Sequence, residues 1–375
     1  MPRRGENIRK RKDGRWEGRF KNGTKSNGKI QYKSIYGKSY SDVKARLKNE
    51  IIKQTEEPTI SVITLPLKEP VTSMKVICFE WLKAIEITLK EPSYAIYYTK
   101  LEKHIIPYFK NVSADIVSNE LLQGFVFALI EKKLEAKTIQ DIFSVLIQII
   151  EYGQHKHYIP IFTINVKLPK KTKTELSIFT KTEQTKLIKY LLQNLTLESI
   201  GILLALSTGI RIGELCALRW SDIDLEEGNI KINFTIQRIK NTNEYATTKT
   251  KIVINRPKSD NSIRIIPLSN FLLEILKKQK VKYPYANYVL TGKEKPIEPR
   301  RYQATYKNIL KSANVTYSKF HTLRHTFATR GIEAGVDPKT LSELLGHSSV
   351  KFTLEYYVHS SVELKKNCVE KIINY

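Results

Sequence analysis

The stretch that decides the fold is HTLRHTFATRGIEAGVDPKTLSELLGHSSVKFTLEYYVH, residues 321–359. The second half of this stretch is predicted to form a helix: Asp337 can cap it, Pro338 suits its first position, and Gly346 can end it. The leucines between these residues give the helix an apolar stripe. His347 is therefore predicted to lie at a helix exit.

The polar side chains of this stretch suit attack on a phosphodiester. Guanidinium groups clamp the non-bridging oxygens of a phosphate, imidazoles donate to these oxygens or move protons, and a tyrosine can be a covalent nucleophile. Such chemistry depends mostly on positioning and on charge stabilisation around the transferring group. The working hypothesis is a cationic pocket that contains a phenol, drawn from His321, Arg324, His325, His347, Tyr356 and Tyr357.

Length and charge narrow the class of partner. The 375 residues suffice for two or three domains, and 41% hydrophobic residues support apolar cores. A count of 63 Lys and Arg against 37 Asp and Glu gives a net charge of +26, which indicates a polyanionic partner. The alternative is a cationic surface that only keeps the protein in solution. There is no long apolar run, and the start MPRRGENIRKRKDG lacks the apolar segment of a secretory signal, so we expect neither membrane attachment nor secretion.

The cysteines argue against a disulfide framework. Cys78, Cys216 and Cys368 are widely spaced, odd in number and without a CxxC pair. We therefore expect no cysteine zinc site and a reducing, cytoplasmic compartment, with all three thiols as packing residues.

Residues 1–55 are basic and aromatic. The alternation in DGRWEGRF, 13–20, predicts one strand, KIQYKSIYG, 29–37, predicts a second, and Ser41 is expected to cap a short helix. A small sheet backed by one helix can lay its strands into a DNA groove. The alternative is a basic tail that folds only weakly. The candidate DNA contacts here are Arg15, Arg19 and Lys33.

The middle of the chain is predicted to be a helical domain between two linkers. Residues 56–72 contain three prolines and no helical period, which indicates an extended linker. Residues 73–165 have helical patterns with wide apolar faces that must pack together, and Lys100 is a candidate phosphate contact. A basic second linker is expected at 166–176. The predicted helices span 73–89, 93–109, 115–133 and 136–154.

The third predicted domain, 177–375, opens with a capping box formed by Thr180 and Glu183. A nearly apolar helix then breaks at Thr208 and Gly209, and a new one begins with Arg211 and Glu214 one turn apart. An arginine in an apolar setting is costly to bury unless an anion meets it. The anion is either Glu214, in a plain intrahelical ion pair, or a phosphate, and both readings stay open.

Lys258 lies on the predicted hairpin tip RPKSDNS, residues 256–262. A lysine at such a tip is ordinarily exposed to solvent and has no further role. If the hairpin folds over a nucleic-acid backbone, its ammonium can protonate a leaving alkoxide.

Five segments occur in a fixed order between residues 208 and 359: TGIRIGEL, PKSDNSIRIIPL, HTLRHTFAT, LSELLGHSS and TLEYYVH. Together they resemble the catalytic domain of the tyrosine recombinases, the phage-integrase family. The resemblance implies a multidomain, mainly α fold with small β elements. It would comprise an arm-type DNA-binding module of a small sheet and helix (1–55), a helical, SAM-like core-binding domain (73–165) and an α+β catalytic domain (177–375).

The resemblance also implies a role for each matching residue. Two arginines would hold the scissile phosphate, a hairpin lysine would be the general acid, two imidazoles would surround the phosphate, and a glutamate would support the first arginine. The two arginines are Arg211 and Arg324, and the lysine is Lys258. The two imidazoles are those of His321 and His347, and the glutamate is Glu214.

The nucleophile falls in EYYVH. Helical periodicity does not separate the two tyrosines, because each shares a face with other apolar residues. The family pattern, a tyrosine two residues before a histidine, selects Tyr357 over Tyr356.

The activity that the resemblance implies is site-specific DNA recombination for a mobile element of a bacterial host, near the nucleoid. The phenol would form a 3′-phosphotyrosyl link and free a 5′-hydroxyl, with no cofactor and no metal. The implied partners are double-stranded DNA with core and arm attachment sites, three further copies in a tetramer on DNA, and an excisionase or host DNA-bending protein as a candidate. Residues 360–375 would pack on a neighbouring protomer or on their own.

Three other functions fit parts of the sequence. The first is a metal-dependent hydrolase. His321 and His325 have the H-x3-H spacing of a helical zinc site, with His347 as a third ligand, but the catalytic glutamate of that motif is missing. A DNA-binding regulator with an inactive recombinase fold is a second alternative. A strand transferase like the type IB topoisomerases is the third.

Overall fold

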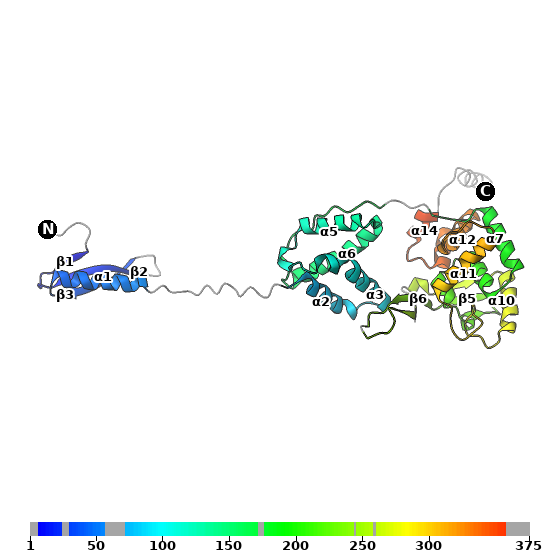
Figure 1. Ribbon diagram of the computed structural model, residues 1–375, viewed down its shortest axis with the longest axis horizontal. Coiled ribbons are helices and arrows are strands. Elements are labelled where there is room, and N and C mark those ends of the chain that lie inside the picture. Colours follow the sequence, from blue (N-terminus) through cyan, green and yellow to red (C-terminus); the bar gives the residue numbers. More distant parts are fainter. Residues whose placement is uncertain are drawn as a thin grey trace, which may run out of the picture. The chain divides into compact units, whose positions relative to one another are not determined.

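The computed structural model shown in Figure 1 contains two compact units, Met1–Thr72 and Ser73–Tyr375, which we describe separately. It describes residues 7–24, 30–56, 72–171, 176–243, 245–257 and 260–357.

The first unit is an antiparallel sheet with one helix. The strand order is β1-β2-β3, so the structure adds a first strand that the sequence did not predict. Its elements are β1 (Ile8–Lys10), β2 (Trp16–Thr24), β3 (Ile30–Gly37) and α1 (Tyr40–Glu56).

Helix α1 packs closely on β2 at Gly18. A Cβ atom there would lie 2.8 Å from Val43 and 2.9 Å from Leu47, so a larger residue would have to displace these side chains. The predicted cap at Ser41 is wrong. The helix begins at Tyr40, and the hydroxyl of Ser39 accepts the hydrogen bond from the Asp42 amide at 3.2 Å.

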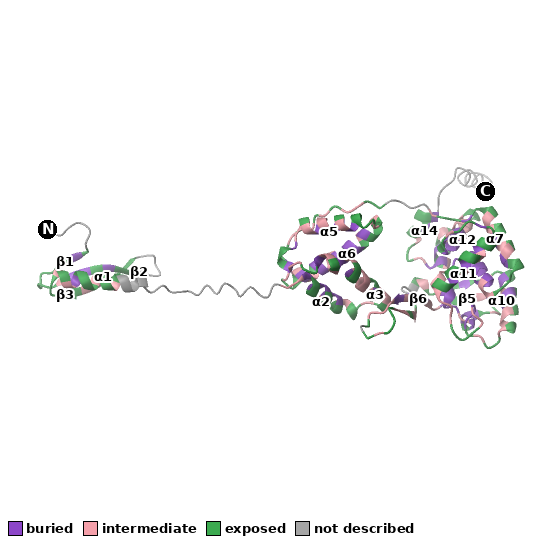
Figure 2. Ribbon diagram, in the orientation of Figure 1, coloured by how far each residue is buried: buried purple, intermediate pink, exposed green. Residues whose placement is uncertain are grey.

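The second unit begins with a bundle of helices around one apolar core. Figure 2 marks the buried residues along its longest helix, α6, which has eight of them. The bundle consists of α2 (Met74–Glu86), α3 (Glu91–Lys100), η1 (Leu101–Ile105), α4 (Ile106–Phe109), η2 (Ala114–Ile116), α5 (Asn119–Glu131) and α6 (Ala136–His155).

The predicted helix 93–109 is continuous in space but contains a π-helical turn, η1, where the Ile106 amide donates to the carbonyl of Leu101. Pro107 follows immediately. A proline inside a helix lacks its amide donor and crowds the preceding turn, and a wider turn relieves this clash.

The segment after α6 is fixed along the bundle. The Gln123 amide group donates to the Lys167 carbonyl at 3.2 Å and accepts from the Lys167 amide at 2.9 Å, and the Gln140 amide donates to Pro169 at 2.8 Å. The first part of the expected second linker is thus held by side-chain hydrogen bonds.

The remainder of the second unit is a helical array with two small antiparallel sheets, in the orders β4-β5-β8 and β6-β7. Helix α8 is its centre, because nine of its twelve residues are buried. The helices are α7 (Lys181–Gln193), α8 (Leu197–Thr208), α9 (Ile212–Cys216), η3 (Trp220–Asp222), η4 (Asp260–Ser262), α10 (Asn270–Lys282), α11 (Pro299–Ser312), α12 (His321–Glu333), α13 (Pro338–Leu345) and α14 (Val350–Tyr357). The strands are β4 (Ile223–Asp224), β5 (Asn229–Ile232), β6 (Thr235–Lys240), β7 (Thr250–Asn255) and β8 (Arg264–Pro267).

Local sequence signals place two of these helices correctly. Thr180 and Glu183 form the predicted capping box of α7. Asp337 caps α13 through the amides of Lys339 and Thr340, and Gly346 ends it in the left-handed region at φ 63°. Along the described part of the chain, every helix is too short or too polar to cross a bilayer.

Candidate active site

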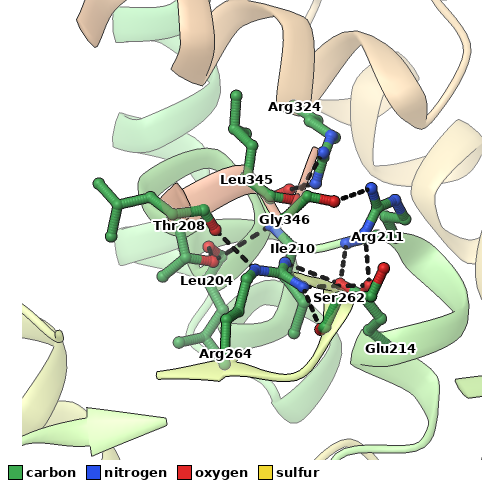
Figure 3. Close-up of polar contacts among 12 residues, drawn as sticks. Leu204, Thr208, Ile210, Arg211, Glu214, Ser262, Arg264, Arg324, Leu345 and Gly346 are labelled. Carbon is green, nitrogen blue, oxygen red and sulfur yellow. Dashed lines mark hydrogen bonds and ion pairs between the residues drawn. The ribbon is translucent and has the colours of Figure 1, made fainter. Parts of the chain in front are cut away.

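Three arginines converge on the end of α13 (Figure 3). Helix C-termini leave carbonyl groups without helical partners and carry partial negative charge, so they attract cations. One helix end thereby fixes three guanidinium groups that come from β8, α12 and the turn between α8 and α9. The bonds run from Arg264 Nε to the Leu344 carbonyl (2.6 Å), from Arg324 to Leu345 (2.7 Å) and from Arg211 to Gly346 (2.9 Å).

The carboxylate of Glu214 links two of these arginines. One carboxylate oxygen accepts from the Arg211 guanidinium at 2.8 Å, and both oxygens accept from Arg264, at 3.2 and 2.9 Å. Burial acts to raise the pKa of this carboxyl, but the hydrogen bonds and charges of Arg264 and Arg211 outweigh it and hold the pKa below its ordinary value. The cluster therefore combines three cations with one ionised carboxylate, and its net charge is positive.

The break between α8 and α9 brings Arg211 to this cluster. Gly209 ends α8 at φ 64°, and a Cβ atom there would lie 2.6 Å from Leu345 and 2.7 Å from Phe327. Its carbonyl accepts a hydrogen bond from Arg324 at 2.8 Å. The glycine thus gives the reversed backbone and the space in which α8, α12 and α13 meet.

The arginines differ in exposure. The side chain of Arg211 is 35% exposed and that of Arg264 only 5%, while Arg324 as a residue is 2% exposed. Arg211 and His321 line a cleft of about 490 Å³, together with β6 and the first turn of α11. Of the three arginines in the cluster, Arg211 is the one that lines this cleft and can contact an anion there. Burial, and then the charges of Arg211 and Arg264, lower the pKa of Arg324, but a guanidinium stays charged at neutral pH.

The histidines surround the same cluster. The rings of His321 and His325 lie edge to face, with centroids 4.5 Å apart. His347 Nδ1 is 2.8 Å from the hydroxyl of the buried Thr353, which fixes the orientation of the ring. Desolvation, and then Arg324 and Arg211, lower the pKa of His347 to about 3.

Desolvation also lowers the pKa of both His321 and His325 to about 4. For His321, whose residue as a whole is exposed, the charges of His325 and Arg324 lower the pKa further. For His325, the charge of Arg324 does so. All three imidazoles are therefore neutral at pH 7 in the folded protein.

The two adjacent tyrosines have different surroundings. Tyr357 is 4% exposed, and its hydroxyl lies 2.7 Å from His325 Nδ1. Burial raises the pKa of this phenol, while Arg324 and Arg211 act to lower it and Tyr356 to raise it. Tyr356 is 41% exposed and stacks on Phe352. Of the two hydroxyls, that of Tyr357 faces the cationic cluster.

Five of the six residues predicted to be catalytic thus lie together with Glu214. The sixth, Lys258, lies outside the described residues. Two members of the site were not assigned a catalytic role from the sequence. Arg264 shares one face of β8 with the buried Ile266, and an arginine on the apolar face of a strand is a signal that the sequence already contains. His325 was counted among the residues of the cationic pocket and considered as a zinc ligand, but it was given no catalytic role of its own.

The residues predicted to contact DNA in the first unit are not on one surface. Arg19 is paired in register with Ser34, whereas Lys33 is paired with Phe20, which is buried toward α1. Opposed residues share a face in an antiparallel sheet, so Arg19 and Lys33 point to opposite faces. Arg15 precedes β2, and its guanidinium donates to Asp13 at 2.9 Å.

Lys100, at the end of α3, is engaged within the bundle. Its ammonium donates to the Asp141 carbonyl on α6 at 2.8 Å, and desolvation lowers its pKa, although Asp141 acts to raise it. No group of three or more His, Cys, Asp and Glu side chains is arranged to hold a metal ion among the residues that the structure describes.

Acid is expected to destabilise this site through its histidines. Their pKa values in the folded protein, about 4 for His325 and about 3 for His347, lie below the ordinary value of 6.5, so the unfolded chain binds more protons over that interval. The free energy of unfolding should therefore fall as the pH drops from about 6.5 towards 4. The lowered pKa of Glu214 gives stability that is lost only further down, below 4.5.

Denaturant unfolding between neutral pH and about pH 5 measures this loss. His347→Gln should make the decline shallower, because glutamine takes up no proton. His155→Gln, at an exposed position at the end of α6, is the control. An identical slope in wild type and His347→Gln would contradict the assignment.

Comparison with known proteins identifies the family and the fold. The sequence pattern that describes the phage integrase family matches residues 172–363 of this chain. A protein named tyrosine recombinase XerC-like, from Caldanaerobacter subterraneus subsp. tengcongensis, is 30% identical over 377 aligned positions, which cover 93% of each chain. The ICEBs1 integrase of Bacillus subtilis is 26% identical over 304 positions, 78% of this chain and 80% of the relative.

Solved structures share the fold. An integrase of the transposon Tn1549, in complex with transposon right-end DNA, superposes with a TM-score of 0.65 at 20% identity, over 80% of this chain and all of the other. A lambda integrase tetramer bound to a Holliday junction gives a TM-score of 0.59 at 16% identity, over 97% of this chain and 99% of the other.

Fold and site together define the class, a site-specific DNA recombinase of the tyrosine type. The chain belongs to the phage integrase family, with relatives among the integrases of mobile elements. The resemblance drawn from the five motifs is confirmed, and so is the predicted multidomain, mainly helical fold with small sheets.

Proposed function

We propose that the protein is the integrase of a mobile genetic element and that it cuts and rejoins DNA through a 3′-phosphotyrosyl intermediate on Tyr357. The observation that carries this proposal is the position of the Tyr357 hydroxyl, buried beside His325 at the edge of the arginine cluster. A phenol is a poor nucleophile near neutral pH, and neighbouring cations favour its ionised form.

The arginines bind the scissile phosphate. A guanidinium has five N–H donors, and Arg211 uses two side-chain hydrogen bonds, to Glu214 and Gly346, so donors remain for non-bridging oxygens. Arg324 adds a second positive charge, held by the carbonyls of Gly209 and Leu345. His321 and His347 donate hydrogen bonds to the same oxygens, and Thr353 orients His347.

The chemical step is a transesterification. The Tyr357 oxygen bonds to phosphorus while the bond from phosphorus to the 5′ oxygen breaks, and Lys258 supplies the proton that this leaving oxygen needs. The phosphotyrosyl ester conserves the energy of the broken bond. The 5′-hydroxyl of another strand can therefore reverse the step and join a new partner without ATP.

The net charge of +26 supports a nucleic-acid partner for the whole chain. We assign arm-site binding to residues 1–55, core-site binding to 73–165 and catalysis to 177–375. The lambda integrase tetramer on a Holliday junction supports assembly as a tetramer on two DNA sites, and the Tn1549 integrase on transposon DNA supports a DNA partner. An excisionase or a host DNA-bending protein would set the direction.

Covalent capture tests the proposal. The wild-type protein is incubated with a nicked duplex from the ends of its resident element. After cleavage, the short fragment that carries the free 5′-hydroxyl diffuses away, so the covalent complex cannot be rejoined. We expect a protein–DNA band that survives denaturation and forms in the presence of a chelator. Proteolysis should leave the DNA on the peptide that contains Tyr357.

Two results would reject the proposal. Binding without any covalent band would favour a regulator with an inactive recombinase fold. Relaxation of supercoiled DNA without strand exchange between sites would favour a strand transferase of the type IB topoisomerase kind.

A further inference from the structure

The hydroxyl of Tyr357 is hydrogen-bonded to a histidine that the family resemblance does not assign to catalysis. His325 Nδ1 lies 2.7 Å from this oxygen, and the two rings are tilted by 42° with centroids 5.8 Å apart. The contact joins α12 to α14, so it depends on the packing of two helices and not on local sequence. His325 follows Arg324 directly in the chain. One turn of α12 thus presents a cation and an imidazole to the same phenol.

The other two histidines are arranged differently. His347 uses Nδ1 on Thr353, and its ring lies parallel to that of Tyr357 with centroids 6.2 Å apart, a stacked geometry that does not aim a nitrogen at the hydroxyl. His321 lines the cleft beside Arg211 and touches His325 edge to face. These positions suit contact with the phosphate. The position of His325 suits contact with the nucleophile.

Protonation gives this hydrogen bond a direction. Burial raises the pKa of Tyr357, so the phenol keeps its proton at neutral pH. Burial, and then Arg324, lower the pKa of His325 to about 4, so its ring is neutral. A protonated phenol beside a neutral imidazole donates its hydrogen to Nδ1, and the proton already lies on the path along which it would leave.

His325 faces Tyr357 from α14, and His321 and Arg324 from its own helix, α12. Tyr357 is further affected by Arg211, at the start of α9, and by the neighbouring Tyr356. The positive charge of Arg324 opposes a second one on His325. A phosphate bound at the arginines adds negative charge and so favours the imidazolium. Substrate binding would therefore strengthen His325 as a base at the moment when the phenol must ionise.

We infer that His325 is the base that accepts the proton of Tyr357 as its oxygen attacks the phosphodiester. The Tyr357 O–H bond breaks toward His325 Nδ1, the phenolic oxygen bonds to phosphorus, and the 5′ oxygen leaves with a proton from Lys258. In the rejoining step a 5′-hydroxyl bonds to phosphorus and gives its proton to Lys258, while the imidazolium returns its proton to the phenolic oxygen as the tyrosyl ester breaks. This role rests on the proposed function, because it requires Tyr357 to be the nucleophile.

The first test replaces the base without removing the polar contact. His325→Gln can hold a hydrogen bond to Tyr357 but cannot take up a proton near neutral pH. In single-turnover covalent capture with saturating protein, we expect its rate to fall by roughly 10²- to 10⁴-fold, the usual contribution of a general base. The wild-type rate should level off above the pKa of His325 in the DNA complex, whereas the His325→Gln rate should keep rising with pH as the phenol ionises by itself. DNA binding, measured by gel shift, should stay the same.

The second test separates the nucleophile from the leaving group. A duplex with sulfur in place of the 5′ leaving oxygen needs no proton on that atom, because a thiolate leaves readily. It should restore cleavage to Lys258→Ala and leave His325→Gln slow. Added imidazole should partly restore His325→Ala, since the half-buried ring leaves a space that the solute can reach. With a purely structural role of His325, added imidazole would not restore the rate of His325→Ala.

The outcomes are distinguishable from failure of the proposed function. If wild type forms no covalent complex, or if Tyr357→Phe still forms one, the proposed function itself fails. If wild type forms a Tyr357-dependent complex and His325→Gln matches its rate and pH profile, the inference is overturned while the proposed function stands. Rescue of His325→Gln by the sulfur duplex would also overturn it, because the residue would then serve the leaving group.

Discussion

Tyr357→Phe is expected to abolish the covalent protein–DNA complex while DNA binding remains. The substitution removes one oxygen and leaves the ring in the small apolar cluster that it shares with Ala328, Leu341 and Leu345. The loss of the hydrogen bond to His325 should cost only about 1 kcal/mol of stability. In a well-studied protease, loss of the nucleophile lowers kcat by about 10⁶-fold, and a comparable loss here would put cleavage below detection.

Tyr356→Phe is the matched control. Tyr356 is exposed and stacks on Phe352, so the loss of its hydroxyl should leave both the fold and the rate of capture unchanged. The pair of variants differs by one position on the same helix. The opposite pattern, with capture lost in Tyr356→Phe and kept in Tyr357→Phe, would show that the buried phenol is not the nucleophile.

Arg211→Ala and Arg324→Ala are each expected to remove roughly 3 to 5 kcal/mol of transition-state stabilisation, by analogy with the loss of other charged or preorganised donors. They should differ in stability. Arg211 is partly exposed, and without it Glu214 still has Arg264 as a partner. Arg324 is buried, and its loss leaves the carbonyls of Gly209 and Leu345 unpaired, at about 1 to 3 kcal/mol for each buried group.

Single-turnover capture rates, with thermal unfolding of the same samples, separate the two effects. Arg330→Ala is the control for α12, because Arg330 bonds to Gln184, to Glu333 and to the Phe179 carbonyl rather than to the cluster. It should lower the unfolding temperature and leave the capture rate of the folded protein unchanged. A capture rate in Arg211→Ala within about twofold of wild type would remove Arg211 from the catalytic set, since even 1.4 kcal/mol corresponds to tenfold.

The sequence by itself determined the local architecture of the site. The Asp337 cap, Pro338 and Gly346 fix both ends of α13, and the position of His347 follows from them. Thr208 and Gly209 mark the break after which Arg211 and Glu214 lie one turn apart, and the structure contains this ion pair at 2.8 Å. These features depend on residues within a few positions of one another, where capping, helical period and backbone freedom act directly.

Only the tertiary structure decided which distant residues join the site. Arg264 reaches Glu214 across 50 positions of sequence, and three arginines from separate elements share the end of α13. The burial of Tyr357 and the exposure of Tyr356, like the contact of His325 with Tyr357, depend on which side of α14 packs toward α12 and α13. Helical periodicity shows that a residue lies on a face but not what that face meets, because the partner is set by the packing of the whole domain.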